Sequence, residues 1–461
     1  MTALPAGLPR DVELKLIKAP LSPPPPARDP AVAAKVSEML LRIEREGMDA
    51  VRAYSHELDN WAPADFAVSR AEIDAATESL PQALLEAIVF AQNQVRGFAE
   101  HQLRSLVDFE VETLPGVRLG QRQIPVARVG AYVPGGRVPM LASPFMTVLV
   151  AKVAGVQRVV VCSPPRGDAG IYPPVLHSIA TSGADAIFAL GGVQALAAMA
   201  FGIEGMGPVD MVVGPGNAFV AEAKRQLFGR VGIDLLAGPS EITVLADETA
   251  DPELVAADLL GQAEHGPTSP AILVTTDEAL ARKVVKEIDR QLEELSFVGA
   301  DQVPRRAWTD HGAAILVNSP EDAVRVVDGL APEHLEVQTG RDEWYFDRLR
   351  NYGSLFLGAR ATVAFSDKAI GTNHTLPTAQ AARYTGGLSV AKFLKTLTYQ
   401  RVVSDVGVQT VAPVVAEISR ADLMPAHEAT ANRRLARLSW LLEPDGVSDT
   451  GSARTPTRPH R

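Results

Sequence analysis

The chain has 461 residues, 46% of them apolar, which is enough for two or more domains with buried cores. Its formal net charge of −11 argues against nucleic acid or an anionic membrane as the main partner, so we expect a protein that acts on small molecules. The single cysteine, Cys162, excludes an internal disulfide and a structural zinc site built from cysteines.

The N-terminal region predicts an arm followed by helices. Residues 1–30 contain "APLSPPPPARDP", which is too rich in proline to form part of a core. Two amphipathic helical patterns come next, in "AAKVSEMLLRIEREG" and "LPQALLEAIVFAQNQVRGFAEHQL". The first residues lack the apolar segment of a secretory signal, so we expect a cytoplasmic protein.

The middle of the chain alternates short apolar strands with helices. The first series contains "ARVGAYVPGG", "RVVVCSPP", "AIFALGG" and "VDMVVGPGN", and a second series begins near residue 241 with "EITVLADE", "AILVTTDE" and "AAILVNSPEDAVRVVDGL". This alternation predicts βαβ units and mainly parallel sheets. We expect an α/β fold with two incomplete Rossmann-like domains, an N-terminal helical arm and a C-terminal helical extension.

Two apolar features of the first series need an interpretation. Residues 186–203 carry no charge, but a Gly-Gly pair and Gln194 interrupt them, which favours a strand, a turn and a helix over a membrane span. Cys162 stands inside "RVVVCSPP", a pattern typical of a buried strand, so we interpret it as a core residue and not as a reactive thiol.

The predicted domain boundaries follow the two series. After the proline-rich arm of residues 1–30, a first α/β domain comprises residues 31–118 and 241–380, a second comprises residues 119–240, residues 381–445 form a helical dimerisation segment, and residues 446–461 are a polar, basic, disordered tail. The first domain carries the polar motifs described below, and the second carries the glycine-rich turns.

Two glycine-rich turns are candidates for binding a nucleotide. The sequence has no G-x-G-x-x-G after a strand, so the usual dinucleotide fingerprint is absent. The turns at residues 132–140, "YVPGGRVPM", and 212–220, "VVGPGNAFV", nevertheless follow strands and precede helices. Backbone N–H groups in such turns can approach a pyrophosphate. Gly-Pro turns are also common as purely structural features, and both interpretations stay open.

Polar motifs of the second half suggest metal binding and proton transfer. In "DLLGQAEHGP", Gln262 and His265 are spaced i,i+3, so they share one helix face on which they can grip an ion, whereas Glu264 points to the other side. In "LAPEHLE", the carboxylate of Glu333 adjoins the imidazole of His334. Such a pair is typical of general acid–base chemistry.

Two further motifs carry histidines. The stretch "FSDKAIGTNHTLPT" contains Asp367, Asn373 and His374, and "DLMPAHEATANRRL" places His427 near Asp422. Each group alone is more typical of a capped turn or a paired core residue than of a ligand. Four clusters in one chain favour a site, although their spacing does not show that they converge.

These motifs together resemble the histidinol dehydrogenase family over roughly residues 30–442. The strings that carry the resemblance, in chain order, are "YVPGG", "KVAGV", "GGVQALAAMAFG", "VVGPGNAFVAEAKR", "GIDLLAGPSE", "DLLGQAEH", "APEHLE", "GSLFLG" and "GTNHTLPT". So many matches in the same order make the resemblance specific.

The resemblance implies an enzyme that uses zinc, one per subunit, and two NAD molecules in succession to oxidise a primary alcohol through the aldehyde to a carboxylate. It implies zinc ligands at Gln262, His265, Asp367 and His427, and NAD contacts at Tyr132, Gln194 and Asn217. It implies substrate contacts at Ser240, Gln262, His265, His334, Asp367, His374, Asp422 and His427, with Glu333 and His334 as the acid–base pair. It also implies an intertwined homodimer in which each chain lends His427 and Asp422 to its partner's site.

The second oxidation needs a hydrated aldehyde, because hydride must leave a tetrahedral carbon. Aldehyde dehydrogenases use a cysteine nucleophile for this purpose. Cys162 is the only cysteine and is expected in a buried strand, so activated water is the natural substitute. We expect Glu333 to be the base for this water, with His334 assisting.

The sequence departs from the histidine-pathway enzymes at the substrate end. Asp422 stands where they have Glu, and "RVPMLASP" follows "VPGG". The stretch "VDGLAPEHLE" lacks the Asn that these enzymes usually have shortly before "APEHLE". The stretch "TVAFSDKAIG" replaces a "GDYASG"-like string. These features are more similar to paralogues that oxidise other small polar alcohols, such as sulfopropanediol. Arg137 is a candidate cation for an anionic substrate group, or a surface residue over the turn.

Three alternatives remain at this point. The first is an authentic L-histidinol dehydrogenase of histidine biosynthesis, with Asp422 in the role of Glu. The second is a zinc hydrolase in which Glu333 activates water without nicotinamide, and the turns with Tyr132, Gln194 and Asn217 speak against it. The third is a metal-stabilised binding protein without activity, which the Glu333–His334 pair makes a poor fit.

Overall fold

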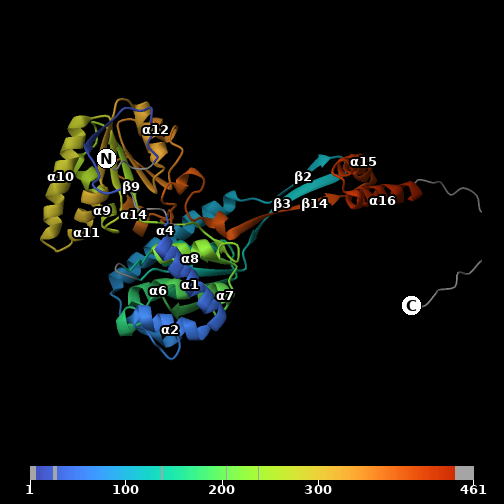
Figure 1. Ribbon diagram of the computed structural model, residues 1–461, viewed down its shortest axis with the longest axis horizontal. Helices are drawn as coiled ribbons and strands as arrows, with labels where there is room; N and C mark the ends of the chain where they lie inside the picture. Colours follow the sequence, from blue (N-terminus) through green and yellow to red (C-terminus); the bar gives the residue numbers. More distant parts are fainter. Residues whose placement is uncertain (1–6, 24–27, 136–138, 204, 237, 442–461) are drawn as a thin grey trace, which may run out of the picture. The chain divides into compact units, whose positions relative to one another are not determined.

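The structure, a computed structural model, describes residues 7–23, 28–135, 139–203, 205–236 and 238–441. Its internal contacts divide the chain into two compact units, Met1–Leu106 with Pro125–Lys395, and Val107–Ile124 with Thr396–Arg461 (Figure 1). Arg137 and the tail expected at residues 446–461 lie outside the described residues.

The first unit contains a six-stranded sheet near which the polar motifs lie. Its strands, in spatial order, are β1 (Leu14–Lys18), β11 (Ala313–Val317), β10 (Ala271–Thr275), β9 (Ile242–Ala246), β12 (His334–Gln338) and β13 (Ser354–Leu357). All neighbours are parallel except β1, which pairs antiparallel with β11. Residues 14–18, expected within the proline-rich arm of residues 1–30, form an edge strand, because Leu14 and Leu16 add apolar side chains to the core at the sheet edge.

Helices cover both faces of this sheet (Figure 1). The helices α9 (Pro252–Ala263), α10 (Glu278–Ser296), α11 (Gln302–His311) and α14 (Val363–Lys368) pack on one face, and α12 (Pro320–Leu330) and α13 (Asp342–Phe346) pack on the other. Leu259 and Trp308 belong to the core of the first face, whereas Val327 and Tyr345 belong to that of the second.

The second sheet of this unit has five parallel strands. Their spatial order is β6 (Ala186–Ala189), β5 (Arg158–Ser163), β4 (Arg128–Tyr132), β7 (Met211–Val213) and β8 (Gly232–Ile233). Cys162 is fully buried in β5, as expected, and burial raises the pKa of its thiol well above the ordinary value. Residues 186–203 form β6, a turn and α7 (Gly192–Phe201), which confirms the predicted strand, turn and helix.

Helices α1 to α8, including all those of the N-terminal third, pack on the two faces of this second sheet. One face carries α1 (Pro30–Glu46), α2 (Met48–Asp59), α7 and α8 (Ala218–Leu227), and the other carries α3 (Arg70–Glu78), α4 (Gln82–Ser105), α5 (Val150–Val153), α6 (Pro173–Thr181) and the π-helical turn Phe145–Leu149. Residues 31–118 were expected with the first sheet. That assignment is corrected here, because the apolar stripe of α1, including Val36, Met39 and Ile43, packs on α7 and α8.

The second unit combines two distant parts of the chain. Its three-stranded sheet has the order β14 (Leu394–Val402), β3 (Val117–Pro125) and β2 (Phe109–Leu114), and its helices are α15 (Asp405–Ala421) and α16 (Pro425–Leu441). Residues 381–445 were expected to be helical, but the alternating "LKTLTYQRV" forms a strand, as β-branched and aromatic residues favour. Alternating sheets and helices confirm the predicted mixed α/β class for the chain.

Among the described residues, we find no helix that combines the length and the apolar character needed to cross a membrane.

A buried ion pair fixes the glycine-rich turn after β7. Lys224 of α8 pairs with Asp234, and both side chains are almost fully buried. The Lys224 ammonium donates to the carbonyl oxygen of Gly214 at 2.9 Å, and Asp234 accepts the N–H of Gly214 at 2.8 Å. Gly214 has φ +115°, and a Cβ there would lie 2.1 Å from the carbonyl oxygen of Tyr132. The pair and the glycine together hold this turn against β4.

We expect Lys224→Met to lower the free energy of unfolding by about 3–5 kcal/mol, because it leaves the Asp234 carboxylate buried without its partner. Denaturant titration measures this change. The double variant Lys224→Met/Asp234→Asn removes both charges and should recover part of the loss. A double variant as unstable as the single one would show that the ion pair does not account for the effect.

Candidate functional site

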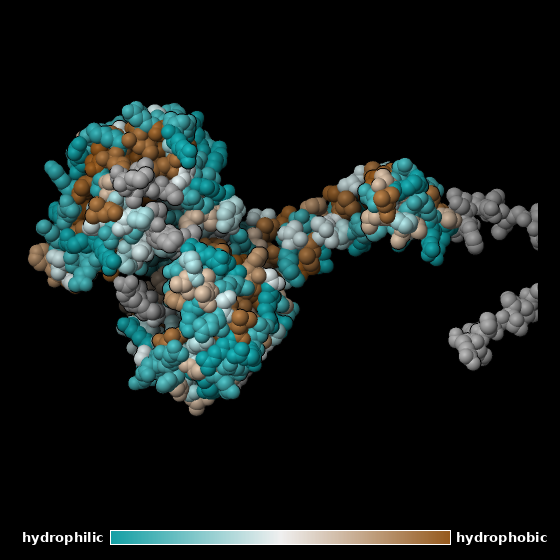
Figure 2. All heavy atoms as spheres, in the orientation of Figure 1, coloured by the Kyte–Doolittle hydropathy of each residue, from teal (hydrophilic) through white to brown (hydrophobic). Residues whose placement is uncertain are grey.

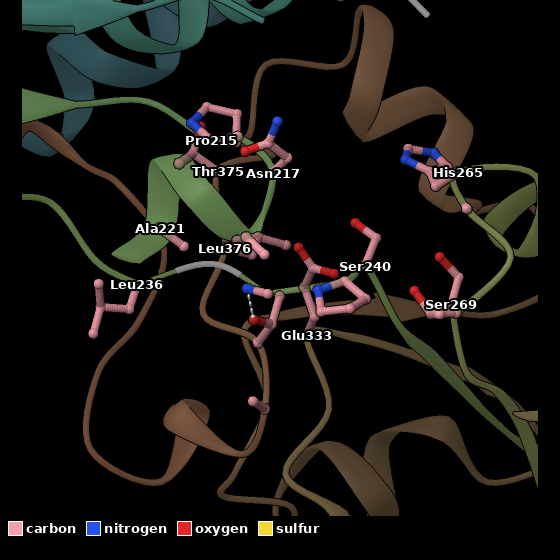
Figure 3. Close-up of a pocket in the computed structure, with 18 of the residues that line it drawn as sticks. Pro215, Asn217, Ala221, Leu236, Ser240, His265, Ser269, Glu333, Thr375 and Leu376 are labelled. Atoms are coloured by element: carbon pink, nitrogen blue, oxygen red, sulfur yellow. Dashed lines mark hydrogen bonds between the residues drawn. The ribbon is translucent and has the colours of Figure 1, made fainter. Parts of the chain in front are cut away.

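A pocket of about 630 Å³ in the first unit collects most of the predicted site residues. Ser240 precedes β9, Ser269 precedes β10, and Glu333 directly precedes β12, so the first sheet contributes the amino ends of its parallel strands. Asn217 comes from the turn after β7, at the carboxyl end of the second sheet. Figure 3 shows Ser240 and Glu333 pointing into the pocket, with His265 on one side and Asn217 on the other.

Glu333 and His334 are held by the backbone of a neighbouring strand. The Glu333 carboxylate accepts the N–H of Glu241 at 2.9 Å and lies 3.4 Å from His334 Nδ1. His334 Nδ1 lies 3.0 Å from the carbonyl oxygen of Glu241, to which it donates, and Nε2 is buried without a partner. Burial opposes a charge on His334, but the Glu333 carboxylate outweighs it and raises the pKa of this imidazole to about 9.

Glu241 is a site residue that the sequence analysis did not single out. Its carboxylate accepts the N–H of Ala379 at 3.1 Å, and its backbone contacts both Glu333 and His334. Burial raises the pKa of Glu241 to about 8, and the nearby Glu333 charge adds to the rise. The string "GIDLLAGPSE" contains this residue, but no pattern of charge or spacing distinguishes it from an ordinary strand start.

A second polar group gathers around Asp367 in α14. Its Oδ2 lies 3.5 Å from His265 Nε2, and its backbone oxygen lies 3.1 Å from His374 Nδ1, which leaves His374 Nε2 buried without a partner. Burial alone would raise the pKa of Asp367, but the hydrogen bond from His265 and the charge of His374 hold it below its usual range. Burial lowers the pKa of His374.

The end of α9 differs from the expected geometry. The helix ends at Ala263 with Glu264 as its C-cap, so His265 lies just beyond the helix instead of on it, because Pro267 disfavours helical backbone at the preceding residue. Gln262 remains inside the helix and is 1% exposed, and neither atom of its side-chain amide has a hydrogen-bond partner.

These residues fit a metal ion in their chemistry. Gln262, His265 and Asp367 offer one amide oxygen, one imidazole and one carboxylate, and the amide is otherwise an unsatisfied buried group. Across the described part of the chain, no three His, Cys, Asp or Glu residues form a group that could hold a metal by themselves.

A second cleft of about 980 Å³ contains Tyr132, Gln194 and Asn217, the residues expected at the nucleotide. The Tyr132 hydroxyl accepts the N–H of Gly192 at 3.2 Å. Asn217 caps α8 by accepting the N–H groups of Phe219 and Val220 at 3.0 and 3.1 Å. Asn217 and His265 line both the cleft and the smaller pocket, so the two spaces adjoin.

Asp59 and Glu264 also line this cleft. Gln194 donates to the carboxylate of Asp59 at 2.9 Å, and its side-chain oxygen is buried without a partner. The sequence analysis missed Asp59, which lies at the end of α2, far from any motif. Glu264 was expected to face away from Gln262 and His265, and it lies in the cleft but not among the residues of the smaller pocket.

Asp422 and His427 belong to the second unit. Asp422 is the C-cap of α15, and His427 lies in the first turn of α16 with its side chain exposed. Neither is among the residues that line the pocket or the cleft. The pocket of one chain therefore brings together Ser240, His265, Glu333, His334, Asp367 and His374 without them.

Comparison with known proteins identifies the family. The family model described as histidinol dehydrogenase matches residues 25–435. The chain belongs to the histidinol dehydrogenase family. Histidinol dehydrogenases and their homologues are dehydrogenases, and the chain is an oxidoreductase of this family.

Three members of the histidinol dehydrogenase family illustrate the similarity. A histidinol dehydrogenase homologue from Shouchella clausii is 51% identical over 407 residues, which are 88% of this chain and 95% of that protein. Sulfopropanediol 3-dehydrogenase from Ruegeria pomeroyi is 46% identical over 422 residues, 92% of this chain and 96% of that one. The crystal structure of histidinol dehydrogenase from Elizabethkingia anophelis superposes with a TM-score of 0.85 and 34% identity, over 91% of this chain and 95% of that one.

The site of this histidinol dehydrogenase family member should make the stability of the metal-free protein depend on pH. The raised pKa of His334 contributes stability that is fully present below its unfolded value near 6.5 and is lost as the pH rises through about 9. The raised pKa of Glu241 removes stability as the pH rises from its unfolded value near 4.5 through about 8. We therefore expect the free energy of unfolding of chelator-treated protein to fall between about pH 5 and about pH 9.

Denaturant titration across this pH range measures the effect. Glu333→Gln removes the charge that raises both pKa values, so its profile should be flatter than that of the unmodified protein. A profile of unchanged slope in Glu333→Gln would contradict the assignment of these shifts to the carboxylate.

Proposed function

We propose that the protein is a zinc- and NAD-dependent dehydrogenase that oxidises a small polar primary alcohol through its aldehyde to the carboxylate. The proposal rests on one observation, which is that the pocket and the larger cleft adjoin each other. The pocket holds a buried Glu333–His334 pair and the His265–Asp367 pair, and the adjacent cleft holds the residues expected at NAD.

Gln262, His265 and Asp367 would hold zinc, with His427 of a second copy completing the set. Bound zinc would polarise the substrate oxygen and fix its orientation. The unsatisfied amide of Gln262 supports this assignment, because a buried polar group without a partner is costly unless a ligand satisfies it.

Tyr132, Gln194 and Asn217 would hold NAD, which accepts the hydride lost in each oxidation. The unpartnered side-chain oxygen of Gln194 and the start of α8 at Asn217 support this assignment, because a helix N-terminus favours an anionic phosphate. The same cleft argues against a zinc hydrolase, which has no use for a second, contiguous space of this size.

His334 would move the proton of the first oxidation. Its Nδ1 donates to the carbonyl oxygen of Glu241, so Nε2 is the nitrogen that accepts the proton of the substrate hydroxyl when the imidazole is neutral, a form that its pKa of about 9 favours at alkaline pH. The Glu333 carboxylate stabilises the resulting imidazolium at 3.4 Å. Ser240 and His374 lie in the same pocket, where they would orient the substrate.

Glu333 would serve the second oxidation as the base that activates water. The Cys162 thiol cannot attack the aldehyde, because it is fully buried in β5 and absent from the pocket lining. Water must therefore supply the second oxygen of the carboxylate. Glu333 lies in the pocket next to His334, so it can take the proton of this water while His334 assists.

The substrate would be a small polar alcohol other than histidinol. Asp422 in place of Glu and the altered strings "RVPMLASP" and "TVAFSDKAIG" change the substrate end while the chemical groups are kept. The similarity to a sulfopropanediol 3-dehydrogenase supports sulfopropanediol as the first compound to test. Histidinol is the second candidate, because Asp422 retains a carboxylate that can bind its amine.

A homodimer with shared sites completes the proposal. In the second unit, β2 and α15 expose large apolar side chains, including Phe109 at 48%, Val414 at 58% and Ile418 at 58% (Figure 2). Apolar surface of this extent is typical of a protein interface. A cytoplasmic location agrees with the single unpaired cysteine and with soluble alcohols as substrates.

We expect NAD reduction with sulfopropanediol to be about 100-fold faster than with L-histidinol, because a reshaped pocket discriminates through transition-state contacts. The measurement is NADH absorbance over a panel of alcohols, and a zinc chelator should abolish it. In Glu333→Gln the yield should fall from two NADH per alcohol towards one, because only the second oxidation needs activated water.

The matched control is Glu248→Gln, an exposed residue beyond the opposite end of β9, which should keep the yield of the unmodified protein. Faster turnover of histidinol would reverse the substrate assignment. A hydrolytic activity without NAD reduction would replace the dehydrogenase by the hydrolase.

We expect a mass of about twice 49.1 kDa by light scattering, and sites shared across the dimer. Sharing is tested by co-expressing His427→Asn and His374→Asn chains, each inactive alone. In the mixed dimer one site contains both changes and the other contains neither, so the purified mixed dimer should have about half of the activity of the unmodified dimer. If His427 served its own chain, both sites would be defective and no activity would return.

A further inference from the structure

Three polar side chains occupy one face of the central strand β12, although this face lies against an apolar core. His334, Glu336 and Gln338 alternate with Leu335 and Val337, which face the other core. Glu336 is 0% exposed and Gln338 is 2% exposed. His334 belongs to the pocket, but the proposed reaction uses neither Glu336 nor Gln338. Buried polar groups at such positions are costly unless hydrogen bonds satisfy them.

The hydrogen bonds of Glu336 connect three elements of the site. One carboxyl oxygen accepts the N–H of Val363, the first residue of α14, at 3.0 Å. The other accepts from Gln338 at 3.2 Å, and Gln338 also donates to Asp258 of α9 at 2.8 Å. Burial raises the pKa of Glu336 to about 9, and the nearby Asp258 carboxyl group adds to the rise.

Both helices reach the pocket within one turn of these contacts. Asp258 stands four residues before Gln262 on α9, and Val363 stands four residues before Asp367 on α14, so each pair lies on the same helix side. His265 follows at the end of α9. The contacts of Glu336 therefore tie the helices that carry the three candidate ligands to the strand that carries His334.

We propose that Glu336 and Asp258, linked through Gln338, are positioning residues that hold α9 and α14 against β12, which sets the spacing of Gln262, His265 and Asp367 for a metal ion. The part of the inference that concerns zinc rests on the proposed function, whereas the link between α14 and β12 does not.

The first experiment uses metal-free protein and hydrogen–deuterium exchange. In Glu336→Ala, the amides of α14 should exchange about tenfold faster, because the helix start loses its acceptor. Glu336→Gln retains an oxygen that can accept the N–H of Val363, so it should protect α14 nearly as well as the unmodified chain. Val337→Ala is the matched control, since it shortens a buried side chain on the other face of the same strand.

The second experiment measures zinc affinity by competition with a chelator. Glu336→Ala and Asp258→Ala should each weaken zinc binding about tenfold or more, whereas Glu336→Gln and Val337→Ala should stay within about threefold of the unmodified protein. Asp258 is only partly buried, so Asp258→Ala tests the same link if Glu336→Ala fails to fold.

The outcomes separate the two proposals. Normal α14 exchange and normal zinc affinity in Glu336→Ala and Asp258→Ala would overturn the positioning role. A loss in Glu336→Gln as large as in Glu336→Ala would contradict the role of the hydrogen bond from Val363 to Glu336. An unmodified protein that binds no zinc would overturn the proposed metal site, and the α14 exchange would then decide the link between α14 and β12 by itself.

Discussion

The pocket depends on one energetic constraint, which is that several of its polar atoms are buried and unpaired. The Nε2 atoms of His334 and His374 and the hydroxyl of Thr375 line the pocket and have no hydrogen-bond partner within the described residues, and the side-chain amide of Gln262 in α9 has none either. Such atoms cost free energy in a core, and a chain tolerates them where a ligand can satisfy them. The surrounding fold must therefore hold these side chains in place without pairing the atoms that would contact a ligand. For the two histidines it does so through the other nitrogen of the ring. His334 and His374 are both fixed by Nδ1 to a backbone oxygen.

The two sheets of the first unit contribute to this pocket in opposite ways. The second sheet supplies turns at the carboxyl ends of its strands, where open α/β sheets usually bind ligands. The first sheet supplies the amino ends of β9, β10 and β12, where the exposed groups are N–H donors. The N–H of Glu241 at one such end holds the Glu333 carboxylate at 2.9 Å. A chain entering a parallel strand can thus orient a carboxylate as effectively as a helix start can.

The sequence predicted the alternation of strands and helices and the parallel sheets, because apolar period is a local property, whereas the resemblance to the family implied most of the residues that line the pocket. It did not predict that α1–α4 pack on the second sheet or that β1 and β14 are strands. An apolar stripe indicates that a segment is buried, but it does not show which other segment it packs against. Glu241, Asp59 and Glu336 were missed for a related reason. Their roles come from contacts between separate elements of the fold, such as Ala379 with Glu241 and Val363 with Glu336, and no spacing along the chain records those contacts. His265 was placed on a helix that ends two residues earlier, because Pro267 acts on the backbone before it.

The helical pair of the second unit has a consequence for the behaviour of the chain in dilute solution. The buried cluster between α15 and α16 consists of Ala412, Ala416 and Ala431, which remove little apolar surface from water. So small a core cannot offset the conformational entropy that two ordered helices lose. The order of this segment must then be supported by apolar contact with another surface. Where that surface belongs to a second copy, folding of the segment and association become one equilibrium that depends on the concentration of the chain.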